Sequence, residues 1–184
     1  IMREAFHITN SGRPGPVLID VPKDFSAGDF EGELFPEMDL PGYSPDEGTP
    51  DQTQVMQIAE ALSKSRQPVI LAGHGVLISG GEDALFALAD KMQAPVTTTL
   101  LGKGAFPESH PLSLGMVGMH GTAYANKALV DCDLIISIGS RFDDRIIGKT
   151  SVFCHDAVRI HVDIDPSEFG RMIKCAHYCR ADAR

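Results

Sequence analysis

Short segments of apolar or β-branched residues, separated by longer stretches with helical periodicity, constrain the fold of this chain most strongly. The segments are residues 68–72, 95–99, 133–138 and 158–163. Between them, apolar residues repeat with helical spacing, as Leu85, Leu88, Ala89 and Met92 do. Strands that are apolar throughout, rather than at every second residue, are typical of a sheet that helices cover on both faces.

This alternation predicts an α/β fold with a doubly wound, mostly parallel, Rossmann-like sheet. Ligands of such sheets bind beyond the carboxyl ends of the strands. The loops that follow Ala72, Thr99, Ile138 and Val162 are therefore the candidate ligand-binding loops.

Charge and composition argue against several classes of function. The 184 residues carry a formal net charge of -9 without a basic cluster, which disfavours broad nucleic-acid binding. No run of about 18 apolar residues is present, so we expect no membrane-spanning helix. Residues 1–20 lack the pattern of a signal peptide, and we expect the four cysteines to be reduced thiols in a cytosol-like compartment.

Composition divides the chain into three parts. Residues 1–24 predict a helix end followed by a strand at Val17–Val21, and this pair cannot bury its own apolar faces. We therefore expect residues 1–24 to be the C-terminal end of a preceding domain, and the chain to be a fragment of a longer protein. Residues 25–48 have the proline-rich, acidic composition of a linker. Residues 49–184 are predicted to form the central α/β domain, truncated at its C-terminal end.

Capping patterns predict where helices begin. Thr49 and Gln52 have the spacing of a capping box at the start of the first helix of the α/β domain. Another helix is predicted over about residues 122–130. Asp165, directly before Pro166, suits the N-cap of a short helix.

Two of the candidate loops carry glycines and charges of the kind that bind phosphates. Gly73-His74-Gly75 resembles half of a dinucleotide fingerprint, but Ile78 occupies the place of the third glycine, so a tight turn explains the motif equally well. In residues 139–145, Arg141 and Arg145 are placed to contact a pyrophosphate, and surface ion pairs are the alternative.

Three further motifs complete the candidate site. Residues 99–102 either cap a strand or form a wall for a flat ring. His120, between glycines before the predicted helix, is either structural or a contact for an anion or polar ring. Asp163 is the candidate acceptor for ribose hydroxyls, whereas Asp165 is assigned to the cap. These loops indicate a dinucleotide, but they do not distinguish a flavin from a nicotinamide.

A cluster of cysteine and histidine at residues 175–179 suggests a metal site only superficially. It lacks a matching second pair of ligands, so we expect no metal centre there.

Several of these segments resemble the large (catalytic) subunits of acetolactate synthases, which are thiamine-diphosphate enzymes. They are residues 12–24 (GRPGPVLIDVPKD), 114–126 (LGMVGMHGTAYAN), 139–145 (GSRFDDR), 148–149 (GK) and 161–165 (HVDID). The resemblance covers essentially the whole chain. It implies a three-domain parent in which residues 1–24 end the pyrimidine-binding first domain and residues 49–184 belong to the FAD-binding middle domain.

The resemblance implies an activity for the parent protein. Such enzymes decarboxylate pyruvate on thiamine diphosphate, held through Mg²⁺, and join the two-carbon unit to pyruvate or 2-ketobutyrate in branched-chain amino-acid biosynthesis. FAD is largely structural in this family. The resemblance further implies a homodimer or homotetramer, a regulatory small subunit, and a cytoplasmic location, or a plastid or mitochondrial one for a eukaryotic parent.

The resemblance also implies roles for individual residues. The implied FAD contacts are Arg13, Gly73, Gly75, Thr99, Leu100, Leu101, Gly118, Met119, His120, Gly139, Ser140, Arg141, Asp143, Arg145, Asp163, Ile164 and Asp182. The implied substrate-channel or inhibitor residues are Lys23, Asp144 and Arg145. The chain contains neither the activating glutamate nor the glycine-aspartate-glycine magnesium motif of the family, so we expect no catalytic residue and no metal ligand in it, and an inactive fragment.

Three alternatives remain at this point. The first is the middle domain of another thiamine-diphosphate enzyme, such as a glyoxylate carboligase or a pyruvate oxidase; the arginine-bearing loop disfavours the oxidase. The second is a freestanding nucleotide- or flavin-binding module without enzymatic activity, which the predicted strand at Val17–Val21 disfavours. The third is a nicotinamide-dependent dehydrogenase, which Ile78 disfavours.

Overall fold

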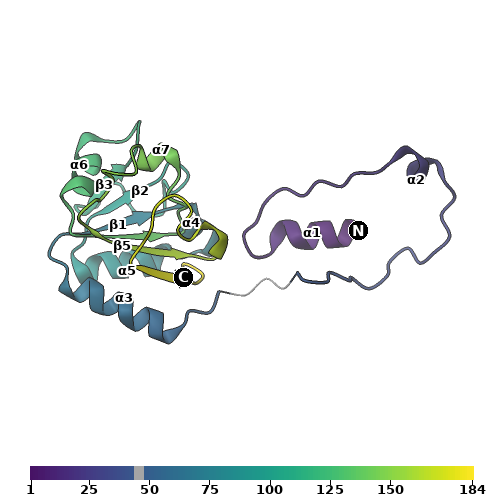
Figure 1. The fold of residues 1–184 in the computed structure, drawn as a ribbon, viewed down its shortest axis with the longest axis horizontal. Coiled ribbons are helices and arrows are strands. Elements are labelled where there is room, and N and C mark those ends of the chain that lie inside the picture. The colour runs from purple at the N-terminus through teal and green to yellow at the C-terminus, as the bar shows by residue number, and fades with distance from the viewer. Residues whose placement is uncertain (44–47) are drawn as a thin grey trace. The chain divides into compact units, whose positions relative to one another are not determined.

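The computed structural model describes residues 1–43 and 48–184. One compact unit lies within residues 1–47, and a second comprises residues 48–184 (Figure 1). In the described residues, no helix has the length and apolarity needed to cross a bilayer.

The first unit is mostly extended chain around a short helix. It contains α1 (Met2–Asn10) and α2 (Lys23–Ala27). Ser11 and Tyr43 join its two ends through a hydrogen bond of 2.7 Å between their hydroxyl groups. The strand predicted at Val17–Val21 is wrong: these residues form no strand, and Leu18 is exposed. A strand needs a neighbouring strand for its backbone hydrogen bonds, and residues 1–43 contain none.

The second unit is built on a six-stranded sheet in which every neighbouring pair of strands is parallel. Its strands are β1 (Pro68–Ala72), β2 (Val96–Thr98), β3 (Ser113–Met116), β4 (Leu134–Ile138), β5 (Val158–Asp163) and β6 (His177–Arg180). Their order across the sheet is β3-β2-β1-β4-β5-β6. The predicted parallel sheet is confirmed. The edge strands β3 and β6 were not predicted from the sequence. Both are mostly half-buried, so neither contains a run of apolar residues.

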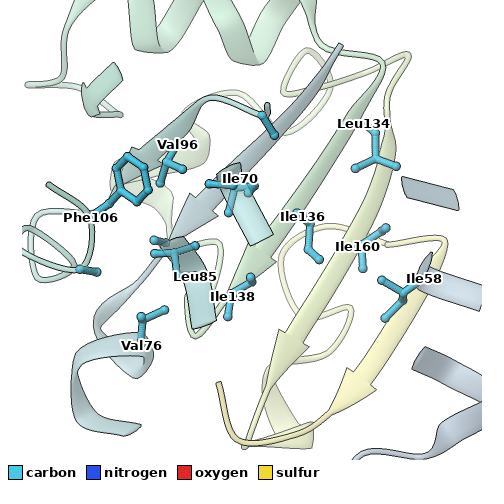
Figure 2. Packing of buried hydrophobic residues seen from close by; sticks show 14 of the residues in the cluster. Ile58, Ile70, Val76, Leu85, Val96, Phe106, Leu134, Ile136, Ile138 and Ile160 are labelled. Carbon is cyan, nitrogen blue, oxygen red and sulfur yellow. The ribbon is translucent and has the colours of Figure 1, made fainter. Parts of the chain in front are cut away.

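Helices cover both faces of the sheet. They are α3 (Gln52–Lys64), α4 (His74–Ser79), α5 (Glu82–Met92), α6 (Ala123–Asp131), α7 (Asp144–Ile147) and the 3₁₀ helix η1 (Pro166–Glu168). On one face, Ile58, Val76 and Leu85 from α3, α4 and α5 pack with Ile70, Ile136 and Ile160 of the strands (Figure 2). On the other face, residues of α6 and α7 pack on alternate residues of β1 and β4, including Leu71 and Ile135.

The capping predictions had mixed outcomes. The capping box at Thr49 and Gln52 is wrong: α3 begins at Gln52, and the carboxylate of Asp51 accepts a hydrogen bond of 2.8 Å from the N–H of Thr53. A carboxylate next to the first turn also stabilises the positive end of the helix dipole. The helix predicted over about residues 122–130 is confirmed as α6, which Thr122 caps, and the predicted cap at Asp165 is confirmed for η1.

The beginning and the end of the second unit lie side by side. The N–H of Asp182, just after β6, donates to the carbonyl oxygen of Gly48 at 2.9 Å. Ile58 of α3 belongs to the same buried cluster as Cys179 of β6. The first helix of the unit is therefore packed beside its last strand.

Asp133 fixes the turn between α3 and β1 to the start of β4. Its carboxylate accepts hydrogen bonds from the Ser65 hydroxyl, from the N–H of Arg66 at 2.7 Å and from the N–H of Gln67 at 3.0 Å. Partial burial acts to raise the pKa of Asp133. The three hydrogen bonds outweigh that effect and hold the pKa below its ordinary value.

We expect Asp133→Ala to lower the free energy of unfolding by about 1–2 kcal/mol at neutral pH, because it leaves several donors without their acceptor. Since the pKa of Asp133 is lowered in the folded state, its stabilisation is present above the unfolded pKa and is lost as pH falls through the folded pKa. The difference between wild type and variant, measured by urea denaturation, should therefore shrink in acid.

Asp131→Ala is the matched control for this experiment. Asp131 is two residues away and pairs with the exposed Lys127, at 2.7 Å. Such exposed pairs contribute little to stability, so this variant should unfold close to wild type. Equal destabilisation by the two variants would contradict the role given to Asp133.

Candidate functional site

The order of strands places a topological switch point at the carboxyl ends of β1 and β4. From β1 the chain proceeds outward to β2 and β3, and from β4 it proceeds the other way to β5 and β6. At such a switch point the loops after the two central strands diverge, and open α/β sheets bind their ligands there. The predicted loops after Ala72 and Ile138 are the two that flank this point.

Glycines allow these two loops to touch. The N–H of Gly73 donates to the carbonyl of Ile138 at 2.9 Å, and the N–H of Gly75 donates to the carbonyl of Gly139 at 3.1 Å. A Cβ atom on Gly73 would lie 2.1 Å from the carbonyl oxygen of Gly139, far inside van der Waals contact. Gly139 has a φ of 62°, which favours glycine. The tight-turn interpretation of Gly73 and Gly75 thus has a direct structural basis.

Residues 139–145, which we call the arginine loop, present their charged side chains to solvent. The Arg141 Nη2 atom lies 3.7 Å from the Asp143 Oδ2 atom, and the Arg145 Nε atom lies 3.7 Å from the Asp144 Oδ2 atom. The side chains of Arg145 and Asp144 are 80% and 75% exposed, so this pair is weak. The surface ion pairs considered from the sequence are present, and they leave both guanidinium groups accessible.

Two residues of this loop have local structural contacts. Asp143 is the N-cap of α7, and its carboxylate accepts a hydrogen bond of 3.0 Å from the N–H of Arg145. Ser140 is buried, and its carbonyl accepts a hydrogen bond of 3.2 Å from the Ser137 hydroxyl. Both residues shape the loop that carries the arginines.

Phe142 anchors the arginine loop, and the sequence motif did not single it out. Its side chain is buried and its φ is 53°, a left-handed conformation that is rare for an aromatic residue. The ring lies 6.0 Å from that of Phe153 and 5.0 Å from that of His161, both in edge contact. The signal in the sequence was one apolar residue within a charged loop.

The loop after β3 lies beside the arginine loop. The N–H of Met119 donates to the carbonyl of Arg145 at 3.2 Å. Asn126 of α6 holds Gly118 on both sides: the N–H of Gly118 donates to the Asn126 Oδ1 atom at 3.0 Å, and the Asn126 Nδ2 atom donates to the carbonyl of Gly118 at 3.0 Å. Met119 and His120 are exposed. His120 also lines a pocket of about 350 Å³ near β3, where Lys103 and Tyr124 contribute to the wall.

The loop after β2 joins the switch point through Thr99. Its N–H donates to the carbonyl of Ala72 at 3.0 Å, and its hydroxyl accepts from the N–H of Gly102 at 2.9 Å. Thr99 is therefore a buried strand cap, as the structural interpretation of this motif predicted. Leu100 and Leu101 are 68% and 67% exposed and offer an apolar surface at the carboxyl edge of the sheet.

The end of β5 places a buried carboxylate at the same edge. Asp163 is 7% exposed, and its Oδ1 atom accepts a hydrogen bond of 2.9 Å from the N–H of Asp165. Ile164 and Asp182, at the ends of β5 and β6, are half-buried. Arg13 and Lys23 lie in the first unit, so their predicted contacts stay predictions.

In the portion of the chain that the structure describes, no group of three or more histidine, cysteine or acidic residues is arranged to hold a metal ion. The residues brought together at the carboxyl edge are instead glycines, arginines, exposed apolar side chains and one buried carboxylate. This set suits an elongated ligand with an anionic centre, a hydroxyl-bearing part and a flat apolar part.

Comparison with known proteins shows to which family the chain belongs. The family described as the thiamine pyrophosphate enzyme, central domain, matches residues 55–184. The chain belongs to this family. Relatives of this chain include the probable acetolactate synthase large subunit of Methanocaldococcus jannaschii, which is 51% identical over 176 residues. That alignment covers 94% of the chain and 29% of the relative.

Other relatives give the same result. The acetolactate synthase large subunit of Corynebacterium glutamicum is 45% identical over 183 residues, covering 100% of the chain and 29% of the relative. That of Lactococcus lactis is 45% identical over 174 residues, covering 95% and 30%. The chain therefore spans less than a third of the length of these curated relatives, and the predicted resemblance to acetolactate synthase large subunits is confirmed.

Proposed function

We propose that this chain supplies the FAD-holding central domain of an acetolactate synthase. The observation that carries the proposal is its similarity, over 94–100% of its length, to acetolactate synthase large subunits. The switch-point geometry supports a dinucleotide as the ligand, because the loops after four parallel strands converge at one edge of the sheet. The resemblance to the family selects FAD among dinucleotides.

The described residues fit the parts of FAD. The guanidinium groups of Arg141 and Arg145 are accessible and suit the pyrophosphate. Asp163, whose Oδ1 atom is already fixed by a backbone N–H, suits the hydroxyl groups at the adenosine end. The exposed side chains of Leu101 and Met119 suit the face of a flat ring, next to His120. Bound FAD would supply a structural element of the active-site entrance rather than hydride transfer.

The activity of the whole protein is part of this proposal. The parent decarboxylates pyruvate and condenses the two-carbon unit with pyruvate or 2-ketobutyrate, using thiamine diphosphate and Mg²⁺ bound by its other domains. It works as a homodimer or homotetramer with a regulatory small subunit, in the cytoplasm or an organelle. Lys23, Asp144 and Arg145 border the substrate channel, where inhibitors also bind, and none of the residues in this chain is catalytic.

We expect the purified full-length parent to be yellow, with the absorbance bands of a bound flavin. It should form acetolactate only when pyruvate, thiamine diphosphate and Mg²⁺ are all present. The 184-residue chain alone should form none, because the thiamine-activating glutamate and the magnesium motif are outside it. A colourless parent that retains NAD would overturn the proposal. A parent that consumes glyoxylate instead of pyruvate would indicate a carboligase of the same family rather than an acetolactate synthase.

A further inference from the structure

His161 is a buried ionisable side chain of the sheet that the proposed site does not use. It lies in β5, two residues before Asp163, and is 1% exposed. Its Nε2 atom has no hydrogen-bond partner in the described part of the chain. An unsatisfied buried polar atom is destabilising, so its retention in the middle of a strand calls for a physical reason.

The carboxylate of Asp163 lies close to this nitrogen. The Nε2 atom of His161 lies 3.8 Å from the Oδ2 atom of Asp163, just beyond hydrogen-bond length. The other oxygen of that carboxylate already accepts from the N–H of Asp165 at 2.9 Å. Asp163 is thus fixed on one side by backbone and faces the imidazole on the other.

The imidazole itself is held between two aromatic rings. The ring centroid of Phe142 lies 5.0 Å away at an interplanar angle of 71°, and that of Phe169 lies 5.2 Å away at 72°. Both are edge contacts of the favourable kind. Phe142 belongs to the arginine loop, so His161 touches the anchor of one proposed FAD-binding segment and faces the carboxylate at the end of another, β5.

We propose that His161 is a positioning residue for the cofactor: its imidazole, fixed by Phe142 and Phe169, orients the Asp163 carboxylate toward the adenosine end of FAD and keeps the arginine loop in register with β5. This inference rests on the proposed function. Since His161 is buried, it acts through Asp163 and Phe142 and does not touch the cofactor. Binding of FAD closes the 3.8 Å gap to a hydrogen bond, as polar contacts of ligand sites often tighten on binding.

The decisive variants are His161→Phe and His161→Gln in the full-length parent. Phenylalanine keeps the ring contacts with Phe142 and Phe169 but lacks the nitrogen, whereas glutamine keeps a donor at a similar reach. We expect His161→Phe to weaken FAD affinity about tenfold, as loss of a hydrogen bond to a charged group does. The melting temperature of its FAD-free form should be unchanged or higher, because an unsatisfied buried nitrogen is removed. His161→Gln should restore FAD affinity to within about threefold of wild type.

Two further variants separate positioning from packing. Asp163→Asn should weaken FAD binding, and the double variant His161→Phe/Asp163→Asn should be no weaker than Asp163→Asn alone, because both act through one carboxylate. Ile160→Val is the matched control: Ile160 is the neighbouring residue of β5 and packs on the opposite face of the sheet. It should lower the melting temperature without changing FAD affinity.

The outcomes distinguish the inference from the proposed function. If His161→Phe binds FAD as tightly as wild type, the positioning role is overturned. It is also overturned if the double variant loses the combined FAD affinity that the two single variants lose. A parallel fall in FAD affinity and in the melting temperature of the FAD-free form would also overturn it, because it would indicate a packing role. A wild-type parent without FAD would instead overturn the proposed function itself.

Discussion

Gly73→Ala in the full-length parent is expected to abolish FAD retention and to lower the free energy of unfolding by about 3 kcal/mol. The added Cβ atom would lie 2.1 Å from the carbonyl oxygen of Gly139 and 2.6 Å from its carbonyl carbon. Both atoms belong to backbone, so no side-chain rotation relieves the contact. The loops after β1 and β4 must then separate at the point where the dinucleotide is proposed to lie.

Flavin absorbance after gel filtration and urea denaturation of the FAD-free form measure the two effects. Gly80→Asn is the matched control, at the other end of the same helix. Gly80 has a φ of 68°, and a Cβ atom there meets nothing within 4 Å. Asparagine tolerates that conformation, so flavin content and stability should stay near wild type. A Gly73→Ala protein with normal flavin content would contradict the switch-point site.

Arg141→Ala and Arg145→Ala are expected to weaken FAD binding without unfolding the protein. Each removes an accessible guanidinium group whose present partner is an aspartate 3.7 Å away, so little stability depends on it. A lost contact between arginine and phosphate corresponds to about a tenfold change in affinity, and the double variant should lose about a hundredfold.

Titration of the FAD-free parent with FAD at two salt concentrations checks this expectation. Wild-type affinity should fall more steeply with salt than that of the double variant, because screening weakens charge pairs. Lys127→Ala removes an exposed cation of α6 that pairs with Asp131, and it should leave FAD affinity unchanged. Unaltered affinity in Arg141→Ala would remove that residue from the site.

The sequence was most informative where local pattern and burial coincide. β1 and β4 are buried almost throughout, so their apolar runs predicted both strands and the two covered faces of the sheet. The edge strands β3 and β6 carry mixed residues, and only their neighbours define them as strands. The opposite error occurred at Val17–Val21, where an apolar run has no neighbouring strand within residues 1–43.

The candidate site was likewise predictable where local pattern decides it and unpredictable where long-range contacts do. The loops that carry it could be predicted, because loops after parallel strands share one edge of the sheet. The contact between Gly73 and Gly139 could not, since it depends on β1 and β4 being adjacent although β2 and β3 lie between them in the chain. The left-handed conformation of Phe142 and the unpartnered nitrogen of His161 likewise depend on residues distant in sequence.

The hydrogen bond between Asp182 and Gly48 has a consequence for how the α/β unit opens. It joins the residue at which the unit begins to a residue just after β6, at 2.9 Å. Ile58 of α3 and Cys179 of β6 also share one buried cluster. Local unfolding of α3 would therefore expose the edge of the sheet at β6, so the backbone amides of these two elements should exchange with solvent as one cooperative unit although they are distant in sequence.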